Sequence, residues 1–333
     1  MTPELIFITG ATGFIGSHVA NVALAAGYRV RLSIRRPEQA EEIQRWLVGP
    51  EEDVETVVIP SMSNVEAFKD ALLGVDYIFH LASPMPGKGE DVRTDYVDPA
   101  VSATVAILEA ALQHTSIKTV IVESSILALL PVGGSSMPPV IPRANTNERH
   151  LINLDMAFPS GFHGHGLKYG ISKIAAHQAT RDFRQQRAPP FKLLTFHPAY
   201  VLGDSLVQAD AESISGMNAQ FWNSLTQPKP SIPGEWVHVR DVADAHVRAI
   251  QHSSDIADGT EFILAAPGTS WQHAVDCVRL WYPRLHVALQ PPFPQSWVID
   301  TQPADKLLRM SWRSGDAIIR DVVEQQLALQ KST

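Results

Sequence analysis

The chain has 333 residues, of which 45% are hydrophobic and 19% are charged, a balance that suits a buried core and excludes a disordered polymer. Lys and Arg number 27 against 35 Asp and Glu, and this formal charge of −8 disfavours nucleic acid and anionic membranes as partners. The single cysteine, Cys277, excludes an intramolecular disulfide and a cysteine-rich zinc site. A single cysteine suits a reducing compartment, and no leader-like pattern stands before the first expected strand. We therefore expect a cytoplasmic protein.

Short β-branched runs alternate with longer segments of helical periodicity through the first two thirds of the chain. The expected strands are Leu5–Thr9, Arg29–Ile34, Glu55–Ile59, Tyr77–Leu81, Thr119–Glu123 and Lys192–Phe196. The expected helices are Phe14–Ala26, Glu38–Leu47, Val65–Leu73, Pro99–Leu112 and Leu167–Arg187. This alternation predicts an α/β fold with a doubly wound parallel sheet, the Rossmann arrangement, in which ligands bind beyond the carboxyl ends of the strands.

The alternation stops after residue 196, where proline-rich stretches begin. We therefore expect a Rossmann domain of residues 1–196 with a returning segment at about 236–265, and a substrate-binding lobe of residues 197–235 and 266–333. The stretch 127–166 is long and rich in proline and glycine. Loops of that length are functional lids or mobile insertions, and the sequence does not decide between these roles.

Three glycines follow the first expected strand, in Thr9-Gly10-Ala11-Thr12-Gly13-Phe14-Ile15-Gly16. Glycine permits a tight turn and a close approach of the backbone to a pyrophosphate, whose charge is stabilised by the free amides and dipole of the following helix. A plain strand-to-helix turn is the alternative. The position between a strand and a helix, with further strands following, predicts a dinucleotide site.

The kind of dinucleotide is indicated at the end of the second strand, which reads Ser33-Ile34-Arg35-Arg36. No acid stands there to hydrogen-bond a ribose 2′-hydroxyl, whereas guanidinium groups suit a 2′-phosphate. The pattern therefore favours NADP(H) over NAD(H). A solvated turn is the alternative for these arginines.

Tyr169 and Lys173 are four residues apart in an expected helix and so share one face of it. A nearby ammonium favours the ionised form of a phenol, so Lys173 is expected to tune Tyr169 for proton exchange with a carbonyl or an alcohol. Ser125 follows the fifth strand, where its hydroxyl could hold the same oxygen. An ordinary pair on an amphipathic helix is the alternative.

The glycine turn, the Ser124-Ser125 pair, the Tyr169 to Lys173 motif and the segments 98–101 and 237–243 together resemble the extended short-chain dehydrogenase/reductase superfamily. The chain is most similar to its dihydroflavonol 4-reductase-like branch of NADPH-dependent aldehyde and ketone reductases. The motifs span residues 9 to about 250. The resemblance implies reduction of an aldehyde or ketone by NADPH, reversible as alcohol oxidation, by a monomer or homodimer.

The resemblance also implies roles for individual residues. Tyr169 would be the acid, Ser125 would orient the carbonyl, with Ser124 as the alternative hydroxyl, and Lys173 would lower the tyrosine pKa and bind the nicotinamide ribose. The residues that it assigns to the cofactor are Gly10, Thr12, Gly13, Phe14, Ile15, Gly16, Arg35, Leu81, Ala82, Ser83, Lys173, His197, Pro198, Ala199 and Val201. Six further residues are candidate substrate contacts because they follow strands or lie in expected loops. They are Met85, Phe162, His163, Tyr200, Phe221 and Trp222.

Three features depart from the family pattern. Ser61-Met62 stands where the family has an acid for adenine, and Glu123 stands where it has Thr or Ser. A carboxylate at that strand end is turned to solvent or paired, and the sequence does not say which. The third departure is the long spacing from Ser125 to Tyr169, which predicts an unusual pocket.

Metal binding is not expected, although the chain has 13 histidines. The spacing of His163 and His165 could place two imidazoles on one side of a loop, but no third ligand is suggested. His246 and His252 fall in an expected helix and are interpreted as structural.

Two other functions use the same scaffold. A nucleotide-sugar epimerase needs the same Tyr and Lys, but residues 197–235 hold only Lys229 as a basic residue, which suits a diphosphate substrate poorly. A non-catalytic NADP(H)-sensing regulator tends to lack the Tyr and Lys pair, whereas this chain has both residues, which favours an enzyme. A small or apolar carbonyl substrate, including a bulky specialised-metabolite ketone, agrees best with the sequence.

Overall fold

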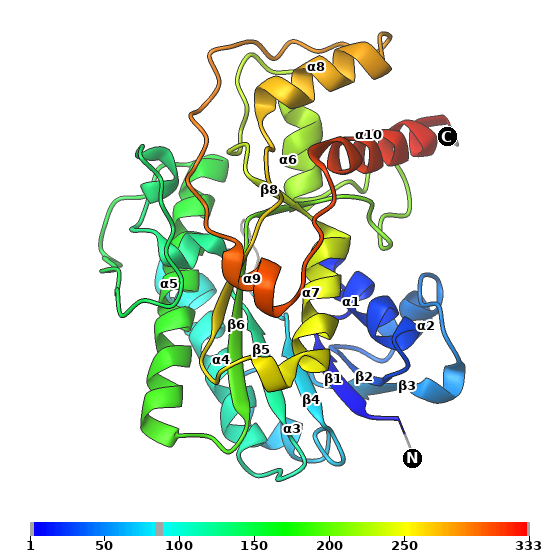
Figure 1. Cartoon of the computed structure of the whole chain (residues 1–333), viewed down its shortest axis with the longest axis vertical. Coiled ribbons are helices and arrows are strands. Elements are labelled where there is room, and N and C mark those ends of the chain that lie inside the picture. The colour runs from blue at the N-terminus through cyan, green and yellow to red at the C-terminus, as the bar shows by residue number, and fades with distance from the viewer. Residues whose placement is uncertain (1–2, 84–88, 332–333) are drawn as a thin grey trace.

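The computed structural model describes residues 3–83 and 89–331, and a seven-stranded parallel sheet forms its centre (Figure 1). The order of the strands is β3-β2-β1-β4-β5-β6-β9, and every neighbouring pair is parallel. Their bounds are β1 Leu5–Thr9, β2 Arg29–Ile34, β3 Val54–Val58, β4 Tyr77–His80, β5 Thr119–Glu123, β6 Lys192–Pro198 and β9 Glu261–Leu264. The predicted doubly wound α/β fold is confirmed.

Helices cover both faces of this sheet and also build a separate group beyond its carboxyl edge (Figure 1). Their bounds are α1 Phe14–Ala25, α2 Gln39–Gln44, α3 Glu66–Lys69, α4 Asp98–Ala111, α5 Gly161–Arg187, α6 Gly216–Leu225, α7 Val239–Gln251, α8 Trp271–Trp281, α9 Gln302–Leu307 and α10 Gly315–Lys331. A two-stranded parallel sheet is formed by β7 Tyr200–Leu202 and β8 Trp236–His238. Among the described helices, none has the length and apolar character that crossing a membrane requires.

The central strands are apolar on both sides because each face of the sheet carries its own helical layer. Along β1, Ile6 and Ile8 belong to the core shared with α1 and α7, whereas Phe7 between them belongs to the core shared with α3, α4 and α5. Successive side chains of a strand point to opposite faces, so this alternation sets the register of the whole sheet. The carboxyl ends of the strands consequently meet at one edge.

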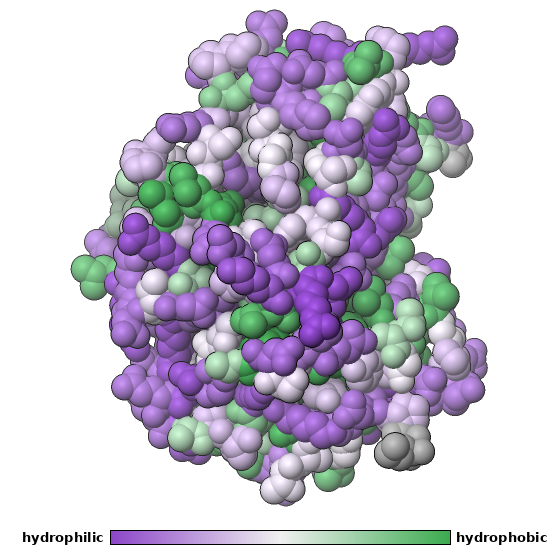
Figure 2. Space-filling model, in the orientation of Figure 1, coloured by the Kyte–Doolittle hydropathy of each residue, from purple (hydrophilic) through white to green (hydrophobic). Residues whose placement is uncertain are grey.

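A smaller lobe of α6, α8, α10 and β8 lies beyond that edge, at the top of Figure 1. Its core is built on three aromatic rings, with Phe221 stacked at 5.2 Å on Trp271 and both in contact with Trp236. On the face shown in Figure 2, hydrophilic side chains predominate and apolar ones form separate small groups. The division into a Rossmann domain and a substrate lobe at the predicted boundaries stays a proposal.

The stretch 127–166 packs closely against helix α5 and against β9. Asn145 binds both main-chain groups of Glu261, donating to its carbonyl at 2.8 Å and accepting from its amide at 2.8 Å. Gln178 and Arg181 of α5 donate to main-chain carbonyls of the same stretch. These contacts hold the stretch in place beside the carboxyl edge of the sheet.

Helix α5 begins at Gly161, six residues before the expected start at Leu167. These six residues were not expected to be helical because Gly161, Gly164 and Gly166 are poor helix formers. The chain just before the helix explains Gly164, since a Cβ there would lie 1.7 Å from the carbonyl oxygen of Pro159. A close approach of backbone, rather than helix propensity, therefore selects glycine at this position.

Candidate active site

The glycine turn joins β1 to α1 with backbone atoms packed too closely for side chains. Gly10 has φ +74°, and a Cβ there would lie 2.9 Å from the amide nitrogen of Ala82. A Cβ on Gly16 would lie 2.2 Å from the carbonyl oxygen of Gly10. Gly13 precedes α1 and offers no side-chain cap, so the first amides of the helix stay available to an anion. The turn thus has the close backbone and helix N-terminus that a pyrophosphate needs.

The turn after β2 is linked to the glycine turn through one side chain. Gln39 accepts from the Arg35 amide at 2.8 Å and donates to the Thr12 hydroxyl at 3.4 Å. Arg35 itself is exposed, and its guanidinium forms no ion pair with any residue in the described part of the chain. Its charge is therefore available beside the glycine turn, as a 2′-phosphate site requires.

The structure brings the three residues proposed as catalytic together at the carboxyl edge of the sheet. Ser125 follows β5, and Tyr169 and Lys173 come from one face of α5. Ser125 is the serine of the pair whose hydroxyl affects Tyr169, since it lowers the pKa of the phenol. The Lys173 Nζ lies 5.6 Å from the centre of the Tyr169 ring and donates to the main-chain oxygen of Glu123 at 3.2 Å.

Burial dominates the electrostatics of this group. Burial first, and the charge of Glu123 second, raise the pKa of Tyr169, whereas the Ser125 hydrogen bond lowers it. The net direction is opposite to the one expected from the Lys173 ammonium alone. Burial also lowers the pKa of Lys173 to about 8, against the effect of Glu123. A raised phenol pKa keeps Tyr169 protonated, which is the form that a proton donor needs.

Cofactor candidates from the later strands also lie at this edge. Ala82 donates its amide to the Thr9 hydroxyl at 3.1 Å, which holds the segment after β4 against the glycine turn. Phe14 and Ile15 at the start of α1 are half-buried, as are Leu81 and Ser83. The remaining candidates lie at the end of β6 and in β7, and they are His197, Pro198, Ala199 and Val201.

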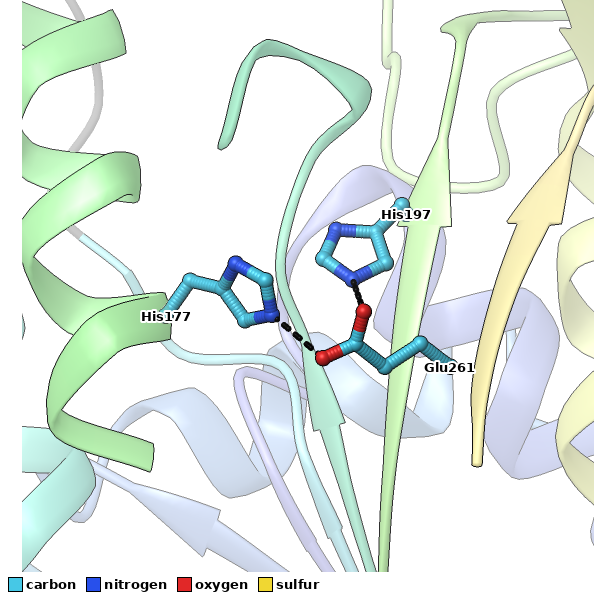
Figure 3. A group of neighbouring side chains, drawn as sticks. All are labelled: His177, His197 and Glu261. Carbon is cyan, nitrogen blue, oxygen red and sulfur yellow. Dashed lines mark hydrogen bonds and ion pairs between the residues drawn. The ribbon is translucent and has the colours of Figure 1, made fainter. Parts of the chain in front are cut away.

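His197 belongs to a buried cluster with His177 and Glu261 that was not predicted from the sequence (Figure 3). Its Nδ1 donates to the main-chain oxygen of Ser125 at 3.1 Å, and its Nε2 faces Glu261 at 3.9 Å. His177 of α5 hydrogen-bonds the other carboxylate oxygen of Glu261 at 2.8 Å. Arg181 donates to both oxygens of Glu261, at 2.7 and 2.8 Å. A guanidinium already neutralises the carboxylate, so the cluster is a structural ion pair rather than a metal centre.

Among the residues suggested as substrate contacts, Tyr200 lies nearest the catalytic group. Burial, then the charge of Glu235 and the proximity of Tyr169, raise the pKa of Tyr200, whereas Ser135 of the 127–166 stretch lowers it. Its ring also contacts Trp297, with ring centres 6.0 Å apart. Tyr200 therefore joins the catalytic edge, the long stretch and the C-terminal segment at one point.

The other substrate candidates are dispersed. Phe162 and His163 are exposed in the first turn of α5, and Trp222 is half-buried in α6. Phe221 is fully buried and belongs to the core of the lobe, where no substrate reaches it. Met85 lies outside the described residues.

The expectation that His163 and His165 lie on a loop is wrong, because both belong to α5. Residues two apart in a helix point to nearly opposite sides, so these imidazoles do not converge on one ion. His165 instead hydrogen-bonds the Tyr96 hydroxyl through Nδ1 at 2.7 Å.

The sheet is doubly wound, and a glycine turn follows its first strand, as in dinucleotide-binding α/β proteins. At its carboxyl edge lie a hydroxyl, a phenol and an amine, which together can form an acid–base site. The model of the NAD-dependent epimerase/dehydratase family matches residues 6–265, and the chain belongs to this family. The predicted membership in the extended short-chain dehydrogenase/reductase superfamily is confirmed.

Relatives within the family cover nearly the whole chain. Ketoreductase sphI of Aspergillus fumigatus is 38% identical over 336 residues, which are 98% of this chain and 98% of that protein. Cinnamoyl-CoA reductase CAD2 of Medicago truncatula is 26% identical, over 96% of this chain and 95% of that protein. The crystal structure of Gre2 from Candida albicans in complex with NADPH has a TM-score of 0.84 at 23% identity, covering 98% and 99% of the two chains, and shows the shared fold.

Proposed function

We propose that this protein is an NADPH-dependent reductase of aldehydes or ketones, with alcohol oxidation as the reverse reaction. The observation that carries the proposal is the grouping of Ser125, Tyr169 and Lys173 at the edge where the glycine turn lies, with the Lys173 Nζ 5.6 Å from the centre of the Tyr169 ring. The whole-length similarity to ketoreductases supports it.

Residues of this chain provide a site that fits the cofactor. The backbone of Gly10, Gly13 and Gly16 leaves room for a pyrophosphate that any Cβ at Gly10 or Gly16 would disturb. Arg35 would hold the 2′-phosphate, and Lys173 with His197 would lie by the nicotinamide end. When bound, NADPH supplies the hydride for the carbonyl carbon.

The remaining chemistry belongs to side chains. Ser125 donates a hydrogen bond to the carbonyl oxygen and orients it toward Tyr169. Tyr169 then transfers its phenolic proton to the same oxygen as negative charge develops there. Lys173 supplies the positive charge that stabilises the phenolate left behind.

The substrate would lie between the catalytic edge and the lobe. Tyr200 and Trp222 offer apolar contacts with one polar group, and the 127–166 stretch closes one side through Ser135. A small or bulky apolar carbonyl compound suits these surfaces. We also propose a cytoplasmic location, which the free Cys277 supports, and a monomer or homodimer.

The proposal is tested by measuring NADPH oxidation, and separately NADH oxidation, across aldehydes, aryl ketones, diketones and flavanonols. We expect turnover of at least one class, with NADPH preferred. Tight NADPH binding without turnover of any carbonyl compound would instead support an NADP(H)-sensing role. Interconversion of a nucleotide sugar without net NADPH consumption would support an epimerase.

Replacement of Arg35 is expected to alter the choice of cofactor. A charged hydrogen bond contributes about 1.5–3 kcal/mol, so Arg35→Ser should lower kcat/KM for NADPH by roughly 10- to 150-fold and leave NADH nearly unchanged. Arg45→Ser removes the same charge from the exposed end of α2 and is the matched control. Equal losses with both cofactors would contradict the assignment of Arg35 to the 2′-phosphate.

A further inference from the structure

Glu123 and His246 form a buried acid and imidazole pair directly beneath the candidate active site. Glu123 ends β5 just before the serine pair, and His246 lies in α7, which covers the sheet. The carboxyl Oε2 and the imidazole Nε2 are 3.5 Å apart. Within the described part of the chain, neither atom has a hydrogen-bond partner, and Glu123 Oε1 has none either, so this ion-pair contact is the one polar contact that the structure shows for the carboxyl oxygens. The carboxyl group is therefore paired with His246 and is not turned to solvent.

The second ring nitrogen of His246 fixes the number of protons in this pair. Its Nδ1 lies 2.8 Å from the carbonyl oxygen of Val242. A carbonyl only accepts, so Nδ1 carries a proton and donates it. A neutral imidazole then presents a bare lone pair at Nε2, and an ionised Glu123 would face it with a second one. Such an arrangement is repulsive, so one proton must lie between Nε2 and Oε2.

Apolar surroundings decide which of the two residues holds this proton. The rings of Phe79 and Phe196 lie 5.2 and 4.7 Å from the His246 ring, centre to centre. A neutral pair costs less in such a place than a carboxylate beside an imidazolium. Burial raises the pKa of Glu123 to about 8 and lowers the pKa of His246 to about 4. Both directions place the proton on the carboxyl group.

We propose that His246 holds Glu123 as a neutral carboxylic acid during turnover, so that Lys173 is the single charge beneath Tyr169. Glu123 acts as a positioning residue, since the charge of its carboxyl group acts on both Lys173 and Tyr169. Loss of its proton would add a negative charge that attracts the Lys173 ammonium and raises the pKa of Tyr169 further. The catalytic consequence rests on the proposed reductase function, whereas the protonation state does not.

The two buried histidines near Glu123 and His246 do not change their charge in this pH range. His80 at the end of β4 and His197 at the end of β6 are both kept neutral, because burial lowers their pKa values to about 3. From α5, only Lys173 and Tyr169 face Glu123. Glu123 and Lys173 are thus the two groups near the reacting oxygen whose charge changes at mildly alkaline pH, and a substitution of Glu123 removes only the first of these changes.

Infrared spectroscopy of the full chain tests the protonation state without any turnover. The wild-type protein at about pH 7 should show the carbonyl stretch of a buried carboxylic acid, and Glu123→Gln should lose it. Glu109→Gln, which removes a surface carboxylate paired with Arg187, is the matched control and should keep the band. Identical spectra for wild type and Glu123→Gln would overturn the proposal. Glu123→Thr gives the same comparison should Glu123→Gln not fold.

Alcohol oxidation tests the catalytic consequence, because Tyr169 must then accept a proton. The wild-type kcat should stop rising above the Glu123 pKa of about 8, since the new negative charge opposes formation of the phenolate. Glu123→Gln cannot acquire that charge, so its kcat relative to wild type should increase roughly 10-fold between about pH 7 and about pH 9, with KM unchanged. Parallel pH profiles would overturn the positioning role. A reductase that fails this test but shows the infrared band would leave the proposed function intact.

Discussion

Tyr169→Phe is expected to lower kcat for carbonyl reduction by about 10²- to 10⁴-fold, the usual contribution of a positioned acid. The phenolic hydroxyl is the group that donates the proton in the proposed mechanism, and phenylalanine keeps the ring that lies beside Lys173. The NADPH dissociation constant should therefore stay within about twofold of wild type, since the glycine turn is untouched. Steady-state kinetics and a fluorescence titration with NADPH measure the two quantities.

Tyr28→Phe serves as the control for this experiment, because it removes a phenol remote from the catalytic edge, beside Tyr77 in the α1 and β2 region. It should retain wild-type kcat. A Tyr169→Phe variant with nearly full activity would show that another group donates the proton, and the proposed mechanism would have to be abandoned. Loss of NADPH affinity in the same variant would point to a structural effect instead.

Gly16→Ala is expected to have the largest effect on cofactor binding. The new Cβ would lie 2.2 Å from the Gly10 oxygen and 2.7 Å from the Ala11 Cα, and both are backbone atoms that cannot rotate away. The turn must open, so NADPH affinity should fall at least about 10-fold and the free energy of unfolding by roughly 1–3 kcal/mol. Titration with NADPH and denaturant unfolding measure these changes.

Gly166→Ala is the matched control, because a Cβ at that helical position would meet nothing within 4 Å. It should leave NADPH affinity unchanged and raise the free energy of unfolding by at most about 1 kcal/mol, from the better helix propensity of alanine. Unchanged NADPH affinity in Gly16→Ala would contradict the assignment of the glycine turn to the pyrophosphate.

Much of the fold was predictable because its signals are local. Apolar alternation placed β1 and β2 within a residue of their observed bounds, and the expected helix at 99–112 matches α4 at Asp98–Ala111. The short helices were less well predicted, as α3 covers only Glu66–Lys69 of the expected 65–73. Helices of that length depend on their neighbours more than on their own periodicity.

The features of the candidate site that are local in the sequence were likewise predictable, and those that depend on long-range contacts were not. Glycine spacing and the four-residue interval from Tyr169 to Lys173 are properties of one turn and one helix, so the sequence alone determined them. It likewise determined the alternation of strands and helices, which places strand ends at a common edge.

Only the tertiary structure decided which distant residues meet. It brought Ser125 close enough to Tyr169 to affect the pKa of the phenol, and it buried Glu123 against His246. It also joined His197 to Glu261, which lies on the last strand of the sheet. Contacts of this kind arise from the packing of whole helices against whole strands, and no periodicity in the chain records them. The local motifs therefore define the chemistry of the site, while long-range packing sets the protonation of the groups around it.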